Sequence, residues 1–324
     1  MALHVIVGYG SAGRAVASLL VEQGHEVRVI TRSGGPADAE VRHVRLDAAD
    51  AEALTGAARG AAVLYNCASP AYHRWAADWP PLAAALLTAA ERTGAVLATV
   101  SNLYGYGPVS EPMTEATPLR AQGTKGRVRA RMWLDALAAH ESGRIRATEI
   151  RACDYIGLDS QSPLGDRVVP RLLAGRKVQV LGSADAAHSW SYIGDVARLL
   201  VAVGSDPRAW GRPWHVPTNA PRTQREAIAD LARIAGVGPV KVAVMPKPAL
   251  KLAGVFNPVV RELAEVAYQT ERPFIIDSSA AQATFGLRPT PWHTVLAETV
   301  AFYQGRQLSQ ACARQESEVA AQLP

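Results

Sequence analysis

The segment "LHVIVGYGSAGRAVASLL", residues 3–20, decides the fold class of this 324-residue chain. Its opening run, 3–7, is apolar and rich in β-branched side chains, which predicts a strand. The glycine motif GYGSAG follows at 8–13, and the spacing of Ala15, Val16, Leu19 and Leu20 predicts a helix after it. A strand, a glycine turn and a helix in this order are typical of a dinucleotide-binding fold.

Each glycine of the motif has an expected role. Gly8 permits the tight turn, Gly10 lets the backbone approach a pyrophosphate, and Gly13 lets the helix pack close to the strand. The N-terminus of the helix then faces the phosphates. We therefore expect the loop to supply seven cofactor contacts: Gly8, Tyr9, Gly10, Ser11, Ala12, Gly13 and Arg14.

The second predicted strand, 25–31, ends without the acidic residue that enzymes using NAD usually carry for the ribose hydroxyls. The chain reads Thr31, Arg32 and Ser33 at this point. An arginine fork suits a 2′-phosphate, and Arg14 is placed to close on the same group. The sequence therefore favours NADP(H) over NAD(H). The alternative is that both arginines are merely exposed to solvent.

Further strand–helix repeats follow along the chain. Strands are predicted over 41–47, 61–69, 95–102 and 147–154, and helices over 82–93 and 124–140. This succession predicts an α/β fold with a doubly wound parallel (Rossmann) sheet. Asp47, at the end of the third strand, is expected near the adenine, and Ala68, at the end of the fourth, lets the cofactor pass close by.

Composition narrows the class of protein. Hydrophobic residues make up 48% of the chain and charged residues 19%, and no apolar run approaches the roughly 18 residues of a membrane span, so we expect a cytoplasmic protein. The three cysteines show no CxxC spacing, so neither a disulfide frame nor a metal site is expected. The net charge is +5, but its arginines are scattered and no nucleic-acid motif appears, so we expect no nucleic-acid partner.

Several motifs together resemble the extended short-chain dehydrogenase/reductase family, which includes nucleotide-sugar epimerases, dehydratases and related ketone reductases. They are GYGSAG, SNLYGYGP at 101–108, Lys125 at the opening of a helix, IRACDYIG at 150–157 and HSWSYIGDVARLL at 188–200. The resemblance covers about residues 3–300. It implies a Rossmann domain of 1–155 plus about 188–204, a smaller C-terminal substrate-binding domain of 156–187 and 205–303, and a tail over 304–324. It also makes Asp195 a candidate N-cap of its helix.

One departure from the family concerns the proton donor. The family pairs a tyrosine with a lysine as Tyr-x-x-x-Lys, but here Ala121 stands four residues before Lys125. The resemblance still implies that Lys125 contacts the nicotinamide ribose, whereas alanine cannot move a proton. Ser101 and Asn102 end the fifth strand, where the family binds the substrate oxygen. Tyr104 is our first substitute donor, with packing under its loop as the alternative.

A second departure concerns the substrate. His188 stands where the family's nucleotide-sugar enzymes carry a phosphate-binding arginine, which weakens the case for such substrates. Asp154 is expected near the nicotinamide, and Tyr155 follows it. Aromatic residues around the expected pocket suit a flat or apolar substrate, although they are equally compatible with core packing. The candidate substrate contacts are His73, Trp75, Tyr155, His188 and Trp190.

These observations predict an NADPH-dependent reductase of a small aromatic or polyketide-like ketone or enone. One alternative is a non-catalytic protein that senses NADP(H). Another is a nucleotide-sugar epimerase or dehydratase. The only partner implied is a small-molecule substrate, and the chain is expected to be a monomer or a homodimer that pairs through helices 82–93 and 124–140.

Overall fold

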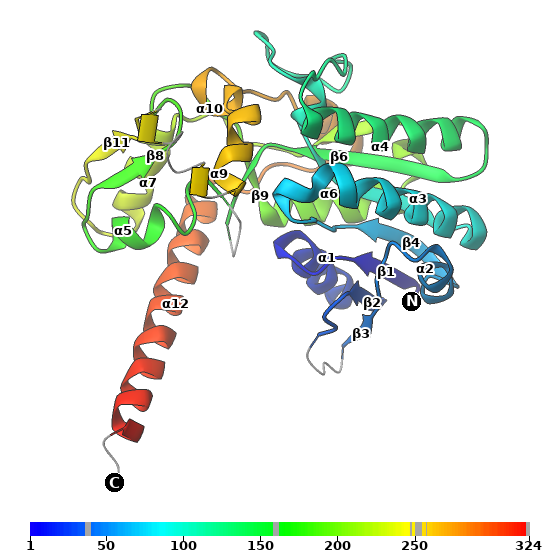
Figure 1. The fold of residues 1–324 in the computed structure, drawn as a ribbon, viewed down its shortest axis with the longest axis horizontal. Coiled ribbons are helices and arrows are strands. Elements are labelled where there is room, and N and C mark those ends of the chain that lie inside the picture. Colours follow the sequence, from blue (N-terminus) through cyan, green and yellow to red (C-terminus); the bar gives the residue numbers. More distant parts are fainter. Residues whose placement is uncertain (36–39, 158–161, 247, 250–254, 257, 322–324) are drawn as a thin grey trace.

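The computed structural model describes residues 1–35, 40–157, 162–246, 248–249, 255–256 and 258–321 (Figure 1). Its centre is a seven-stranded parallel sheet of order β10-β6-β5-β4-β1-β2-β3. The predicted doubly wound α/β fold is confirmed. The strands are β1 (Leu3–Val7), β2 (Glu26–Thr31), β3 (Val41–Arg45), β4 (Ala61–Asn66), β5 (Val96–Asn102), β6 (Arg146–Ala152) and β10 (Pro213–His215).

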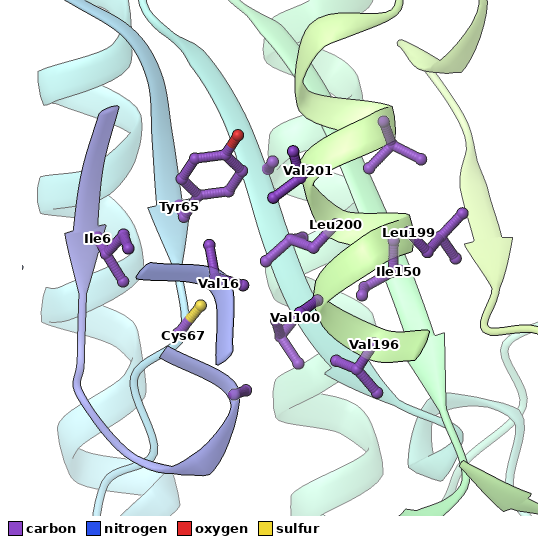
Figure 2. Packing of buried hydrophobic residues seen from close by; sticks show 14 of the residues in the cluster. Ile6, Val16, Tyr65, Cys67, Val100, Ile150, Val196, Leu199, Leu200 and Val201 are labelled. Atoms are coloured by element: carbon purple, nitrogen blue, oxygen red, sulfur yellow. The ribbon is translucent and has the colours of Figure 1, made fainter. Parts of the chain in front are cut away.

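Helices cover both faces of this sheet because both faces carry apolar side chains. Ile6 points to a core shared with α1 (Ser11–Glu22) and α6 (Ile193–Ser205), as Figure 2 shows for Val16, Val196 and Leu200. Val5 points to the opposite core, which is shared with α2 (Ala51–Ala57), α3 (Trp75–Thr93) and α4 (Thr124–Glu141). Burial of both faces explains why the strands read as nearly continuous apolar runs.

The smaller domain lies beside the carboxyl edge of the main sheet (Figure 1). Its core joins helices to the two-stranded sheet of β8 (Val178–Val180) and β11 (Val242–Val244). A capping box between Thr223 and Glu226 begins α7. Its helices are α5 (Val169–Leu173), α7 (Gln224–Ile234), α9 (Pro258–Leu263), α10 (Tyr268–Glu271) and α12 (Trp292–Ala321), with the 3-10 turn η4 (Ala264–Val266) between α9 and α10.

Three expected boundaries differ from the structure. Helix α3 begins at Trp75 rather than at 82 and continues through Pro80 and Pro81, because Trp75 and Trp79 on its first turns are buried in the core. Strand β10 lies within 205–303, which was expected to belong to the smaller domain, but it completes the main sheet beside β6. It has only three residues, too few to show the alternating pattern of a strand in the sequence. The expected tail continues α12 to residue 321 as one helix.

Two smaller expectations also differ. Asp195 is not the N-cap of α6: the cap position is Tyr192, and Asp195 lies buried in the first turn, where it accepts hydrogen bonds from the backbone N–H and hydroxyl of Thr290 at 2.8 and 2.7 Å. The strand predicted over 147–154 ends at Ala152. Asp154 instead begins β7 (Asp154–Ile156), which pairs with β9 (Trp190–Tyr192).

The described ranges contain neither a candidate membrane span nor a candidate metal cluster. No helix there is both long and apolar enough to cross a bilayer. No group of three or more His, Cys, Asp or Glu side chains in those ranges is arranged to hold a metal ion.

Candidate active site

The glycine turn after β1 has the geometry that a dinucleotide needs. Gly8 has φ +95°, and a Cβ there would lie 2.7 Å from the backbone of Ala68. A Cβ on Gly13 would lie 2.1 Å from the Gly8 carbonyl oxygen, so only glycine allows this approach of helix and strand. In front of Gly10 nothing lies within 4 Å, and no side chain caps the N-terminus of α1. The turn therefore fits a pyrophosphate at the helix N-terminus.

The other predicted cofactor residues lie around this turn at the carboxyl edge of the sheet. Arg14 donates to the Tyr9 carbonyl at 3.1 Å. Arg32 is exposed directly after β2. Asp47, after β3, is also exposed, and its carboxylate accepts from the N–H of Ala49 at 3.1 Å. Ser11 and Ala12 form the start of α1. Their contacts with a cofactor remain predictions.

Tyr104 lies in an aromatic cluster beside the fifth strand, on the 3-10 turn η2 (Tyr104–Tyr106). Its hydroxyl lies 3.2 Å from that of Tyr72, which belongs to the turn η1 (Tyr72–Arg74) before α3. Its ring stacks on Trp75 with centroids 5.8 Å apart. The buried guanidinium of Arg129 contacts both Trp75 and Trp79, 4.9 and 4.2 Å from their ring centroids.

Lys125 is buried at the start of α4 with 1% of its surface exposed. Its ammonium forms ion pairs with Glu262 and, at 3.4 Å, Glu265, and Glu265 also accepts from its backbone N–H at 2.6 Å. Both carboxylates come from the α9–η4 segment of the smaller domain. The expected ribose contact of Lys125 therefore competes with two carboxylates. Ala121 precedes the helix, where its N–H donates to the Gly105 carbonyl at 3.1 Å.

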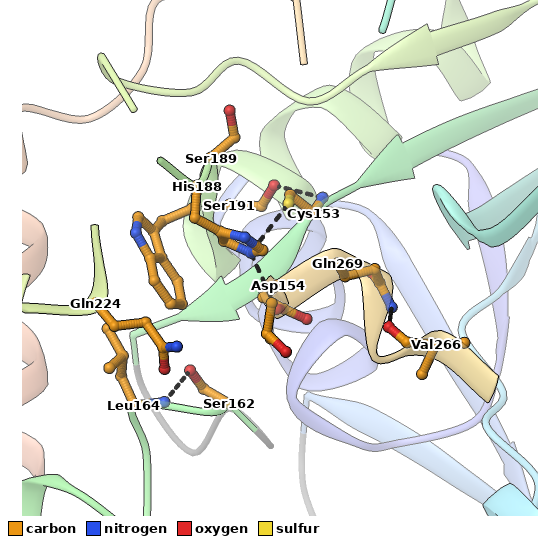
Figure 3. A network of polar contacts seen from close by, with 12 residues as sticks. Cys153, Asp154, Ser162, Leu164, His188, Ser189, Ser191, Gln224, Val266 and Gln269 are labelled. Atoms are coloured by element: carbon orange, nitrogen blue, oxygen red, sulfur yellow. Dashed lines mark hydrogen bonds and ion pairs between the residues drawn. The ribbon is translucent and has the colours of Figure 1, made fainter. Parts of the chain in front are cut away.

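His188 forms a buried pair with Asp154 (Figure 3). Its Nε2 lies 3.0 Å from an Asp154 oxygen and 3.5 Å from the Cys153 sulfur. Burial opposes charge on the imidazole, but contact with Cys153 and Asp154 holds the pKa of His188 well above its ordinary value. His188 is therefore engaged within the protein, and Asp154 is the member of the pair that reaches the cavity described below.

The remaining sequence candidates lie at different depths. Ser101 and Trp190 are 3% and 4% exposed, and Tyr155 packs against the main core. The Asn102 side chain accepts from the Tyr104 N–H at 3.1 Å and so fixes the turn that carries this tyrosine. His73 is exposed on η1. The substrate roles of these residues remain predictions.

A cavity of about 1690 Å³ lies between the two domains. Tyr72, Tyr104 and Asp154 form its wall on the Rossmann side, and most of the remaining wall comes from the smaller domain. The smaller domain contributes two arginines, Arg167 and Arg261, to this wall. Burial raises the pKa of both tyrosines, so their hydroxyls remain protonated at neutral pH.

Sequence reasoning did not predict the partners of Lys125. Glu262 and Glu265 lie 137 and 140 residues further along the chain, and no local pattern links them to the lysine. Gln269, which hydrogen-bonds Tyr104, is equally remote. Only the fold brings these side chains to the site.

Comparison with known proteins places the chain in a family. The sequence matches the NAD dependent epimerase/dehydratase family over residues 5–216. Among curated proteins, none matches.

Solved structures share the fold across nearly the whole chain. The dTDP-glucose 4,6-dehydratase of Bacillus anthracis, in complex with NAD, is 17% identical with a TM-score of 0.77, covering 94% of this chain and 97% of that one. The UDP-glucose 4-epimerase of Thermotoga maritima, with UDP-glucose, is 18% identical with a TM-score of 0.76, covering 94% and 99%. A dTDP-glucose 4,6-dehydratase of Streptomyces venezuelae, with NAD bound, reaches 22% identity, a TM-score of 0.70 and coverage of 94% and 97%.

The glycine turn, the doubly wound sheet and the family match agree with one another. The protein is an oxidoreductase-type enzyme that belongs to the NAD-dependent epimerase/dehydratase family.

Proposed function

We propose that the protein is a nicotinamide-dependent oxidoreductase that converts nucleotide-activated sugars, as an epimerase or a dehydratase does. The size of the cavity carries this proposal. Its volume of about 1690 Å³ exceeds the roughly 300–1000 Å³ of sites for drug-sized ligands, and leaves room for a nucleotide joined to a sugar. Arg167 and Arg261 on its wall bring positive charge to a diphosphate.

The substrate class also follows the similar structures, which are a dTDP-glucose dehydratase and a UDP-glucose epimerase. This proposal takes the place of the ketone reductase that the aromatic residues of the sequence favour. His188 does not weigh against it in this geometry, because the wall carries other arginines that can take the phosphate contact.

For the cofactor, we propose a preference for NADP(H) that rests on Arg32. A bound nicotinamide supplies the hydride donor or acceptor of the reaction. The glycine turn binds the pyrophosphate, and Arg32 lies exposed after β2, where a 2′-phosphate would accept from its fork. Two of the similar structures hold NAD, and the proposed preference for NADP(H) rests on Arg32 of this chain alone.

The direct test is conversion of dTDP-glucose, UDP-glucose and UDP-glucuronic acid by the purified protein with NAD⁺ or NADP⁺, with products read by mass spectrometry and NMR. Arg261→Gln and Arg167→Gln should each raise KM about tenfold, because a charge-assisted hydrogen bond is worth about 1.5–3 kcal/mol. Arg171→Gln, on the outer side of α5, is the matched control. Tight cofactor binding without conversion of any sugar nucleotide would favour the NADP(H)-sensing alternative.

The protonated hydroxyls favour a second candidate, the ketone or enone reductase. Tyr72 and Tyr104 face the cavity and keep their protons, which suits donation to the alkoxide formed when a carbonyl is reduced. NADPH carrying deuterium at the transferable position, mixed with aromatic ketones and enones, tests this candidate. Deuterium in a ketone-derived product, together with inert sugar nucleotides, would make it the main function.

A further inference from the structure

Two tyrosine hydroxyls meet at the cavity wall although neither belongs to the Tyr-x-x-x-Lys positions. The Tyr72 hydroxyl donates to the Tyr104 oxygen at 3.2 Å, and the residues are 32 positions apart. Both line the cavity. The two rings form a T-shaped pair, with centroids 6.5 Å apart at 85°. The two side chains are therefore fixed relative to each other and open to the same ligand space.

The groups around Tyr104 act on the charge of its oxygen in opposite directions. Burial and then the negative charge of Asp154 raise the pKa of Tyr104, whereas hydrogen bonds from Tyr72 and Gln269 and the positive charge of Arg129 oppose that rise. Arg129 is 7% exposed, and its Nε has no hydrogen-bond partner among the described residues. Its guanidinium lies 4.9 Å from the ring centroid of Trp75, which stacks on Tyr104, so this buried cation supports a phenolate at Tyr104.

Lys125 is poorly placed to give Tyr104 the same support. Its ammonium lies 4.7 Å from the ring centroid of Tyr72 and is neutralised by Glu262 and Glu265. Burial and then contact with Tyr104 raise the pKa of Tyr72, with smaller contributions from Asp154 and Glu265, and this keeps that hydroxyl a hydrogen-bond donor. The arrangement gives the two tyrosines different tasks.

We propose that Tyr104 and Tyr72 act as one proton-donating unit, in which Tyr104 delivers the proton to the substrate oxygen and Tyr72 stabilises the phenolate that is left. This inference rests on the proposed oxidoreductase function. As hydride reaches the carbonyl carbon, the C=O π pair moves to oxygen, the Tyr104 O–H bond breaks and a substrate O–H bond forms. The phenolate accepts the Tyr72 hydrogen bond until water returns the proton. In the oxidative direction the same bonds break and form in reverse.

The test is a double-mutant cycle on the full chain with cofactor bound, using Tyr104→Phe, Tyr72→Phe and the double variant. The probes are dTDP-glucose, UDP-glucose and an aromatic ketone panel. Tyr104→Phe should lower kcat by about 100-fold or more, the lower end of general acid catalysis. Tyr72→Phe should lower kcat by about tenfold with little change in KM, since it removes one hydrogen bond to a charged oxygen.

The double variant should be within about threefold of Tyr104→Phe, because residues that act as a unit are strongly non-additive. Two results would overturn the proposal that the tyrosines act together. One is a loss of kcat in the double variant equal to the product of the two single losses; the other is a loss of kcat below about threefold for Tyr104→Phe. Tyr65→Phe is the control, since it removes a buried hydroxyl that bonds His4 away from the cavity. Equal cofactor affinity and equal Tm across the set exclude a folding effect.

A second readout needs no substrate. In protein labelled with ¹³C at tyrosine Cζ, Tyr72→Phe should shift the Tyr104 resonance and Tyr65→Phe should not. If the wild-type protein converts no probe, the proposed function fails. The ¹³C resonance of Tyr104 then tests the hydrogen bond between Tyr72 and Tyr104 independently of activity. An unmoved Tyr104 resonance then overturns the inference, whereas a shift sustains the hydroxyl pair.

Discussion

Gly13→Ala tests the packing that builds the cofactor turn. A Cβ at this position would lie 2.1 Å from the Gly8 carbonyl oxygen, while ordinary Cβ contacts lie at 3.4–4 Å. Since both atoms belong to the backbone or are fixed to it, α1 must move away from β1 by about 1 Å. Overpacking of this kind costs about 1–3 kcal/mol, and the better helix propensity of alanine returns at most about 1 kcal/mol.

The matched variants separate stability from binding. We expect Gly13→Ala to lower Tm by about 2–8 °C and to weaken NADPH binding about tenfold or more, measured by thermal denaturation and by fluorescence titration. Gly10→Ala meets no atom within 4 Å, so it should cost at most about 1 kcal/mol yet weaken NADPH binding as strongly. Gly56→Ala, in α2 with equally open surroundings, should leave binding unchanged.

Two results would refute this reasoning. Gly13→Ala with the Tm and NADPH affinity of the wild type would show that the helix does not need its close approach to the strand. Gly10→Ala with full affinity would show that no pyrophosphate approaches the backbone at this glycine.

Three further predictions concern charge. Arg32→Asp should reverse the preference for NADPH over NADH by tenfold or more in binding titrations, whereas Arg42→Asp on the adjacent strand should not; an unchanged preference would remove Arg32 from the site. Burial and then His25 lower the pKa of His4 to about 4, so the unfolded state binds a proton at His4 before the folded state does as pH falls. The wild type should therefore lose up to about 3 kcal/mol of unfolding free energy between pH 6.5 and 4. Urea titrations at each pH measure this loss, and His4→Gln should not show it. Glu265→Gln should weaken the ion pair with Lys125 and speed amide hydrogen exchange in α9–η4. Unchanged exchange would show that this ion pair does not hold α9–η4 against the start of α4.

The main sheet and the glycine turn could both be predicted from the sequence alone. Both are encoded locally, because a fully buried strand reads as a short apolar run, and the three glycines stand within six residues, where Gly8 takes a positive φ and Gly13 approaches the Gly8 carbonyl oxygen. The start of α3 was predicted too late, after Pro80 and Pro81, because prolines usually end a helix. In the structure, burial of Trp75 and Trp79 outweighs the backbone hydrogen bonds that these prolines remove.

The candidate site was predictable only in part. Tyr104 and Asp154 follow strands and were expected at the carboxyl edge, where the structure places them on the cavity wall. The partners of Lys125 come from a segment some 140 residues away, so no spacing rule could reveal Glu262 and Glu265. The contact between His188 and Asp154 could not be predicted for the same reason, because it depends on the pairing of β7 with β9, which are distant in the sequence.

The function proposed for this chain is hydride chemistry on a sugar nucleotide at a bound nicotinamide. Rapid mixing of the protein, loaded with NAD⁺ or NADP⁺, with dTDP-glucose or UDP-glucose tests it most directly. We expect a transient rise in the near-ultraviolet absorbance of reduced nicotinamide, and a much smaller rise in Gly10→Ala. Cofactor bound at full occupancy with no reduced nicotinamide formed from either sugar nucleotide would contradict it.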